Sequence, residues 1–200
     1  MVSPTGRDPE TNATLLEEAA VWRFLHDLFR GPSESQWAWL NEESVGQAWE
    51  LLATATGQTP SELPRPGDYA EYETSYLSAF EVGVPCPPCP LVESHWMRAE
   101  PVPQILHENV LFYRQFGLEL KSAQGETADH LRHQLEFLAH LCTSEANAAD
   151  DESAEQISRG RSDFLDRRVR PWIAIAAEAA GEVFPDAWPS QWMALLAAWV

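Results

Sequence analysis

The chain has 200 residues, a length typical of one domain that buries a hydrophobic core without disulfides or metals to stabilise it. Its apolar content of 44%, with nine tryptophans, excludes a chain that is disordered throughout, because such chains lack the apolar surface that offsets the entropy of ordering. The 31 acidic and 13 basic residues give a formal charge of −18, which argues against a nucleic-acid-binding protein and favours a basic partner.

The N-terminal part of the chain predicts a tail followed by two helices. Residues 1–12 are polar and contain two prolines and a glycine, so we expect a flexible tail before a single domain over residues 13–200. A helical stripe follows (Val21, Phe24, Leu25 and Leu28), and Gly31 ends it. Ser33 can cap a second helical stretch, which reaches Gly57.

A third helix and a proline-rich loop are predicted next. Tyr72, Tyr76 and Phe80 lie four residues apart, which places three aromatic rings on one face of a helix that begins near Asp68. Aromatic residues at this spacing are either core residues or the lining of a groove. Residues 84–103 contain six prolines, so we expect an extended loop there, and long ordered loops are often functional.

The second half of the chain continues the helical pattern. A helix is predicted from Val102 to Gly117, and another after Thr127, where Leu131, Leu135, Leu138 and Cys142 recur at helical spacing. Residues 143–158 are mostly Ala, Glu, Asp and Ser, so we expect an acidic mobile loop or weak helix. Two further helical stripes follow, and no two-residue period occurs. The sequence therefore predicts an all-α domain, a bundle of six to seven helices.

The location of the chain follows from what its sequence lacks. No run of eighteen apolar residues occurs, and the first ten residues have no apolar stretch of the kind that a secretory signal needs. The three cysteines are an odd number and do not form a disulfide framework. We therefore expect a cytoplasmic protein without membrane insertion.

Cys86 and Cys89 form a Cys-Pro-Pro-Cys motif that leaves several interpretations open. A redox dithiol needs a thiolate of lowered pKa, usually at a helix that follows a strand, and neither is predicted here. A zinc site that adds His95 and His107 lacks regular spacing. Packing, or the lining of a peptide groove, is the interpretation that the sequence favours.

Asp129 and His130 stand at a predicted helix start. They could act as general acid and base or as metal ligands, but no Glu-x-x-His pair of the kind used by di-iron bundles is present. The simpler interpretation is a first-turn carboxylate that accepts hydrogen bonds from backbone N–H groups, with His130 partly exposed beside it. No nucleotide-binding or serine-hydrolase motif occurs. For Arg167 and Arg168 we expect a solvated helix face.

Three stretches carry a resemblance to a known family. Residues 76–96 contain Pro-Pro-Cys-Pro-Leu-Val-Glu-Ser-His-Trp, residues 112–138 contain Glu126-Thr127-Ala128-Asp129-His130, and Phe164-Leu165 is followed by Trp172. Together they resemble the TorD/DmsD/NarJ family of chaperones dedicated to molybdoenzymes. In the family's Glu-Pro-x-Asp-His pattern, Thr127 replaces the proline here. The first stretch is most similar to the branch that serves selenate, chlorate, dimethyl sulfide and ethylbenzene enzymes.

The resemblance implies an all-helical cytoplasmic chaperone, which is not an enzyme and has no cofactor or metal of its own. Its partner would be the catalytic subunit of a molybdopterin enzyme, held back from export through its twin-arginine signal peptide or N-terminal segment until the molybdenum cofactor is inserted. A receptor for two guanidinium groups and an apolar stretch needs carboxylates beside an aromatic groove. We therefore assign peptide binding to Tyr76, Phe80, Pro88, Glu93, Trp96, Glu126, Asp129 and His130.

Two other functions remain open at this stage. The chain could be an enzyme in which Cys86 and Cys89 act as a dithiol or hold a metal, or it could be a structural subunit that stays in the mature complex. The sequence is compatible with binding of the signal peptide or of the mature subunit of a molybdoenzyme, with or without a nucleotide, and with a monomer or a domain-swapped dimer.

Overall fold

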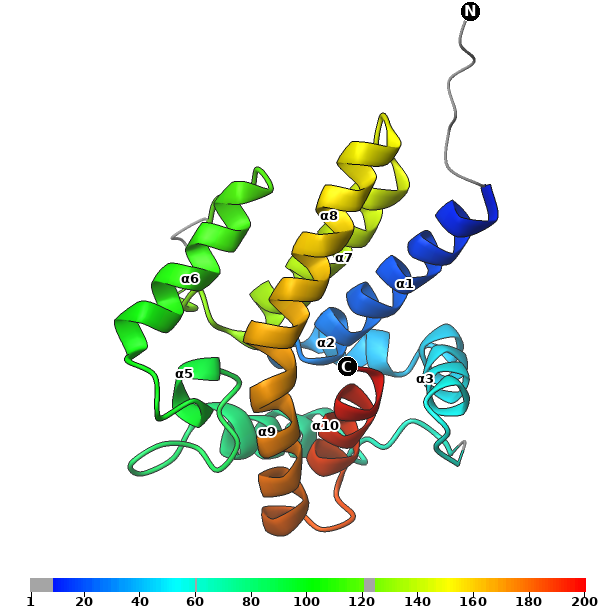
Figure 1. Cartoon of the computed structure of the whole chain (residues 1–200). Helices are drawn as coiled ribbons and strands as arrows, with labels where there is room; N and C mark the ends of the chain where they lie inside the picture. The colour runs from blue at the N-terminus through cyan, green and yellow to red at the C-terminus, as the bar shows by residue number, and fades with distance from the viewer. Residues whose placement is uncertain (1–8, 60, 121–124) are drawn as a thin grey trace, which may run out of the picture.

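Figure 1 shows a computed structural model of the chain, which describes residues 9–59, 61–120 and 125–200. The described residues form helices, one isolated β-bridge and connecting loops, so the predicted all-α class is confirmed. The α-helices are α1 (Pro9–Leu28), α2 (Glu34–Leu40), α3 (Glu43–Ala55), α4 (Tyr69–Tyr76), α5 (Glu93–Trp96), α6 (Val102–Gln115), α7 (Leu131–Ala146), α8 (Asp151–Phe164), α9 (Arg170–Val183) and α10 (Trp188–Trp199).

The predicted number of six to seven helices is too low. Two π-helical segments, η1 (Leu77–Glu81) and η3 (Leu165–Val169), continue α4 and join α8 to α9 without a break. When such continuous segments are counted as one, the described part of the chain has nine helices. Hydrophobic periodicity did not reveal α2 and α5 as separate helices, because at seven and four residues they are too short to show a stripe.

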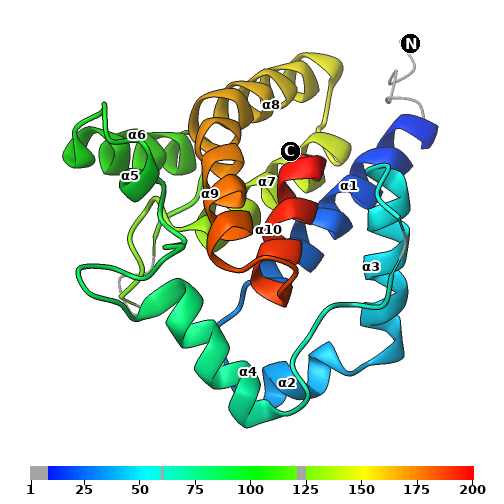
Figure 2. The same ribbon diagram turned by 90° about the horizontal axis from the view of Figure 1, so that it is seen from below.

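Helices α1 and α7 lie against each other over much of their length and form the middle of the molecule (Figures 1 and 2). Leu25 and Leu28 of α1 and Leu135 and Leu138 of α7 are fully buried and belong to one hydrophobic core. Helix α10 packs on α9 at one side of this pair, and α8 packs on α7. The predicted stripe of α7 is therefore part of the core, whereas the predicted stripe of α1 is core at Leu25 and Leu28 and only partly buried at Val21 and Phe24.

Of the two alternatives expected for residues 143–158, an acidic mobile loop or a weak helix, the structure has mostly helix. Helix α7 continues to Ala146, and α8 begins at Asp151, so only residues 147–150 form a connection. The Asp150 carboxylate accepts a hydrogen bond from the Ser153 N–H at 2.7 Å, and acidic residues in the first turn suit the positive end of the helix dipole. Local capping therefore makes this polar segment helical.

The predicted N-terminal tail also ends earlier than expected. Helix α1 begins at Pro9, so residues 9–12 are helical, while residues 1–8 lie outside the described residues. Proline is well tolerated in the first turn of a helix, where its missing N–H needs no partner. The loop expected over residues 84–103 is irregular as predicted, apart from the single turn of α5 and the start of α6.

The aromatic rings of α4 and η1 lie in the core rather than on the surface. Tyr72, Tyr76 and Phe80 are each no more than 3% exposed, and all three contact Trp188 of α10 with ring centroids 5.8 to 6.4 Å apart. The hydroxyl of Tyr76 donates a hydrogen bond to the carbonyl of Phe29 at 2.8 Å. These rings attach α4 to α10 and to the end of α1.

The helices in the described part of the chain are all too short or too polar to span a lipid bilayer.

Candidate functional site

The loop that precedes α6 is fixed to the start of α7 by backbone hydrogen bonds. Val92 and His130 form an antiparallel β-bridge, the Glu93 N–H donates to the carbonyl of Asp129 at 3.1 Å, and the Leu131 N–H donates to that of Leu91 at 2.8 Å. Two sequence stretches that carry the family resemblance therefore lie side by side. This pairing sets the positions of Glu93 and Asp129.

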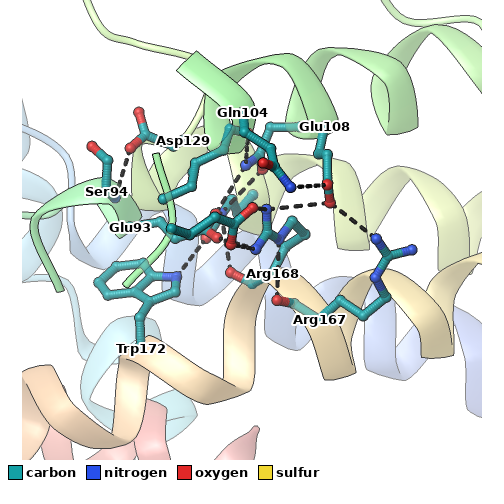
Figure 3. A network of polar contacts seen from close by, with 12 residues as sticks. Glu93, Ser94, Gln104, Glu108, Asp129, Arg167, Arg168 and Trp172 are labelled. Carbon is teal, nitrogen blue, oxygen red and sulfur yellow. Dashed lines mark hydrogen bonds and ion pairs between the residues drawn. The ribbon is translucent and has the colours of Figure 1, made fainter. Parts of the chain in front are cut away.

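Asp129 is fully buried and caps the short helix α5. One carboxylate oxygen accepts a hydrogen bond from the backbone N–H of Ser94 at 2.9 Å (Figure 3). The other accepts one from the hydroxyl of Thr127 at 2.5 Å. The simpler interpretation from sequence, a carboxylate that satisfies backbone donors, therefore describes its contacts, although the backbone donor belongs to α5 rather than to α7. The predicted role of Asp129 as a peptide contact conflicts with its burial.

Glu93 is the centre of a buried polar network (Figure 3). Its Oε2 accepts hydrogen bonds from the side-chain amides of Asn109 at 2.9 Å and Gln134 at 2.7 Å, while its Oε1 lies 3.1 Å from the guanidinium of Arg168. Glu93, Asn109 and Gln134 are fully buried, and Arg168 is 4% exposed. Its burial keeps Glu93 away from the surface, so the predicted peptide contact of Glu93 stays a prediction that these contacts do not support.

The network extends to further helices through Arg168 and Gln134. The guanidinium of Arg168 also lies 2.7 Å from Glu100 and 3.4 Å from Glu108, and Gln134 accepts a hydrogen bond from the Trp172 indole N–H at 3.0 Å. These contacts connect the loop, α6, α7, η3 and α9. We call Glu93, Asn109, Gln134, Arg168 and Trp172 the buried network. Its contacts hold these segments of the fold together.

Burial dominates the electrostatics of Glu93. Desolvation raises the pKa of its carboxyl group to about 7, although Asn109, Arg168 and Gln134 all favour the ionised form. Burial also opposes the charge of Arg168, but the carboxylates around it together have the larger effect and raise the pKa of its guanidinium group. Neighbouring polar groups therefore stabilise the charged form of the buried pair of Glu93 and Arg168. Loss of one partner leaves the charge of the other uncompensated.

Arg168 was expected on a solvated helix face, and that expectation is wrong. The sequence carried a signal for the correct placement, because Arg168 stands four residues from both Phe164 and Trp172, which are fully buried. A charged side chain within an apolar stripe indicates a buried partner of opposite charge. Arg167, one residue earlier, is half exposed and pairs with Glu108 at 2.9 Å.

A second polar cluster lies at the surface, where the start of α7 meets the end of α1. Glu126 contacts Arg132 at 3.0 Å and His133 at 3.4 Å, and Arg132 donates to the ring of His26 at 3.3 Å. His130 is the N-cap of α7, and its Nδ1 accepts a hydrogen bond from the Arg132 N–H at 3.3 Å. The side chains of Glu126, Arg132, His133 and His26 are 17 to 23% exposed. We call this the histidine cluster.

The histidine cluster disfavours charge on His130. Burial is the main cause, and with the nearby His133 and Arg132 it lowers the pKa of His130 to about 4, although Glu126 and Asp129 oppose the shift. Burial and Arg132 also lower the pKa of His26. The lone pair of His130 is therefore available near neutral pH to accept the capping hydrogen bond, as an N-cap requires.

The aromatic groove predicted from Tyr76, Phe80, Pro88 and Trp96 does not form as a unit. Tyr76 and Phe80 are core residues, which is the other role that their helical spacing allowed. Their predicted place in the lining of a groove stays a prediction that their burial does not support. Pro88 is exposed, whereas Trp96 is half-buried and donates its indole N–H to the carbonyl of Pro90 at 2.9 Å. These side chains thus divide between the core and the surface.

An exposed apolar loop lies beside carboxylates instead. Val82 is 63% exposed and Val84 is fully exposed, in the turn that follows η1. Gly83 permits this turn, because a Cβ there would lie 2.2 Å from the carbonyl oxygen of Cys86. Glu81 directly precedes the turn and is an exposed residue. Partial desolvation of its carboxyl group, together with the negative charge of Glu126, raises the pKa of that group.

The loop and its carboxylates define a surface at the end of α1. A Cβ at Gly31, just after α1, would lie 3.6 Å from Oε1 of Glu81, which shows that Glu81 reaches this end of the helix. Glu81 was not among the predicted site residues, because it belongs to no motif. We call Glu81, Val82, Val84 and Glu126 the acidic-apolar surface, and its pairing of carboxylates with exposed apolar side chains suits a cationic, partly apolar peptide.

The cysteines give little support to redox or metal chemistry. Cys86 is exposed and Cys89 is buried, and burial raises the pKa of the Cys89 thiol to about 12. The Cys89 thiol donates to the carbonyl of Ala176 at 3.7 Å, as a packed core residue would. Among the described residues, no group of three or more His, Cys, Asp or Glu side chains is placed to hold a metal ion.

Comparison with known proteins gives a family match and several relatives. The family model described as nitrate reductase delta subunit matches residues 40–178. The chain is 31% identical to a perchlorate reductase assembly chaperone protein from Dechloromonas aromatica over 54% of its length, and 38% identical to a selenate reductase assembly chaperone protein from Thauera selenatis over 50%. It is 35% identical to a chlorate reductase assembly chaperone protein from Ideonella dechloratans over 63%.

These matches cover 48%, 53% and 63% of the three relatives, so the chain spans about half to two thirds of their length. Among solved structures, the crystal structure of a proposed redox enzyme maturation protein from Archaeoglobus fulgidus superposes with a TM-score of 0.53. That match has 17% identity and covers 98% of this chain and 97% of the other, and at this identity it supports the fold alone.

Proposed function

The chain belongs to the nitrate reductase delta subunit family, and from this premise we propose that it is an assembly chaperone for the catalytic subunit of a molybdopterin oxidoreductase. The names of three relatives support this function, since each is an assembly chaperone protein for a reductase of an oxyanion, namely perchlorate, selenate or chlorate. The protein binds its partner and has no catalytic turnover of its own. It works in the cytoplasm, before the partner is exported.

The acidic-apolar surface is the region that we propose for binding the partner's N-terminal segment. Glu81 and Glu126 lie close enough for the charge of Glu126 to raise the pKa of Glu81, so a bound cation would relieve repulsion between them. The exposed side chains of Val82 and Val84 can bury the apolar residues of the same segment. The exposed Glu81, directly before the exposed side chains of Val82 and Val84, is the observation that carries the proposal.

Arginine suits this surface better than lysine. One oxygen of Glu126 already pairs with Arg132, so a ligand must share the carboxylate, and a planar guanidinium can approach two carboxylates at once. The overall charge of −18 attracts a basic segment from a distance. We therefore propose a twin-arginine signal or similar N-terminal segment as the ligand, held until the molybdenum cofactor is inserted.

Two experiments test this function. In cells that lack the chain, the partner reductase should accumulate without its molybdenum cofactor, and adding the chain back should restore its activity. With purified protein, calorimetric titration should show that the partner's N-terminal segment binds more tightly than the same segment with both arginines replaced by lysine. A reductase that matures fully without the chain would overturn the proposed function, and equal binding of the two segments would overturn the role of arginine.

The alternative of an enzyme that uses Cys86 and Cys89 finds no support in the geometry. Its nucleophile would have to be a thiolate, and burial opposes ionisation of Cys89. Thiol titration provides a direct test, because an enzyme of this kind would show one cysteine ionised near neutral pH.

A further inference from the structure

A large groove lies between α1, α3, the α8–η3 junction and the end of α10. We propose that this groove binds a basic amphipathic helix of the partner subunit, at a second point of contact separate from the acidic-apolar surface. The inference rests on the proposed function, because the occupant belongs to the same partner. In Figure 2, α3 lies on the outer side of the molecule next to α1.

The lining of the groove is mostly apolar. It has a volume of about 830 Å³, and its apolar walls include Val21, Phe24, Leu51, Leu52, Leu165 and Trp199. Leu51 is 72% exposed at the edge of the groove, which leaves a large apolar side chain in water. Exposed apolar surface that borders a groove, with charged residues around it, is typical of a protein interaction site.

The dimensions of the groove suit one face of a short helix. The lining residues of α1 run from Thr14 to Phe24, which corresponds to about 15 Å along the helix axis. A whole helix of that length and about 10 Å in diameter would occupy roughly 1,200 Å³. The groove volume of about 830 Å³ is smaller, so it can take the apolar side chains of two to three turns while the polar face of the helix stays in water.

The charges around the groove favour a basic occupant. Both arginines of the lining are already paired inside the chain, Arg161 with Glu18 at 2.7 Å and with Glu145 at 3.2 Å, and Arg170 with Asp166. Glu17 also lines the groove and is exposed, and no ion pair to it is found within the described residues. Negative charge is therefore left at the edge, in a chain whose total is −18. Lysine or arginine beside the apolar face of the occupant complements this edge.

The groove and the acidic-apolar surface lie at different parts of α1. Groove residues occupy positions 14 to 24 of this helix, whereas Glu81 lies near Gly31, beyond the other end. A partner bound at both places is held by two linked contacts, which raises its apparent affinity without any new contact. Separate positions also mean that each contact can be removed without disturbing the other.

The test uses a probe of defined chemistry, a labelled amphipathic peptide of leucine and lysine about 18 residues long, and a matched peptide of leucine and glutamate. Fluorescence anisotropy measures their binding to the full chain and to two variants. Leu51→Lys places a positive charge at the groove. Val183→Lys makes the same change at a half-exposed position on α9 that does not line the groove. Both sites are exposed, so neither variant should unfold, and circular dichroism checks this.

We expect the lysine peptide to bind the unchanged chain, the glutamate peptide to bind at least about tenfold more weakly, and Leu51→Lys to lose at least about tenfold in affinity. Val183→Lys should stay within about twofold. Equal binding to the two variants would overturn the groove proposal, as would self-association in sedimentation velocity that Leu51→Lys abolishes, since the occupant would then be a second copy.

A cellular measurement separates this inference from the proposed function. If the reductase needs the chain to mature and Leu51→Lys supports less maturation than Val183→Lys, the groove is used by the partner. If the reductase needs the chain and Leu51→Lys supports full maturation, the chaperone function stands and the groove proposal fails. If the reductase matures without the chain, the proposed function fails first.

Discussion

The buried network around Glu93 and the histidine cluster around Glu126 differ in what their charges can do, although both draw on residues 126–134. Glu93 and Arg168 are almost inaccessible to water, and their contacts join five segments of the fold. Glu126 and Arg132 form a similar ion pair, but at the surface, where a ligand can compete for it. Burial therefore limits the carboxyl group of Glu93 to contacts within the fold, whereas we propose that the more accessible carboxylate of Glu126 takes part in binding.

Because the buried network is inaccessible to water, we expect the largest loss of stability from a substitution of Arg168. Replacing Arg168 with alanine removes the cation beside Glu93 and Glu100, so that Glu93 must either stay charged without a partner or take up a proton, and this should lower the free energy of unfolding by about 3 to 5 kcal/mol. Urea denaturation followed by circular dichroism measures the loss. The double variant Arg168→Met with Glu93→Gln removes both charges and should recover much of it. A single variant as stable as the unchanged chain would show that the pair contributes nothing to the fold.

The next effect depends on pH and concerns His130. Its pKa is about 4 in the folded chain and near 6.5 when unfolded, so between these values only the unfolded state binds the proton. The contribution of His130 to the free energy of unfolding is therefore complete above about pH 6.5. It is lost as the pH falls toward 4, and the loss is no more than about 3 kcal/mol.

His130→Asn provides the control for this pH effect, because asparagine also caps a helix but does not titrate. The difference in unfolding free energy between the unchanged chain and this variant should shrink or reverse as the pH falls from 7 to 4. A difference that stays constant over this range would show that His130 titrates normally in the folded state.

A smaller loss is expected at Asp129. Asp129→Ala removes the acceptor of the Ser94 N–H and the Thr127 hydroxyl, and hydrogen bonds to a charged group contribute about 1.5 to 3 kcal/mol. Asp129→Asn keeps one acceptor oxygen and should lose less. If Asp129 instead bound the peptide directly, both variants would weaken binding while the unfolding midpoint stayed unchanged, and this outcome would contradict its structural role.

The smallest change in stability is expected at the surface. Glu126→Gln removes a partly exposed ion pair with Arg132, and such pairs typically contribute no more than about 1 kcal/mol. The same variant should clearly weaken binding of the partner's N-terminal segment. Thermal unfolding and calorimetric titration of one sample measure the two quantities together. A loss of stability as large as that of Arg168→Ala would remove the distinction between the two regions.

The sequence predicted the fold better than the site. Helical spacing located the stripes of α1 and α7 because a buried helix face leaves a local pattern. It could not show that Glu93 and Asp129 are buried, since their partners lie far along the chain, Arg168 and Gln134 for Glu93 and Ser94 for Asp129. Glu81 was missed for a related reason, because its nearness to Glu126 exists only after folding. The burial of Arg168 was predictable from its place among apolar residues.

The measurement that tests the central claim most directly is calorimetric titration of the partner's N-terminal segment into two charge-reversal variants, Glu81→Lys and Glu178→Lys. Both positions are exposed, and Glu178 lies on α9, outside the acidic-apolar surface. The account predicts that Glu81→Lys weakens binding at least about tenfold while Glu178→Lys stays within about twofold, with unchanged unfolding midpoints for both. Equal affinities for the two variants would contradict the assignment of binding to the acidic-apolar surface.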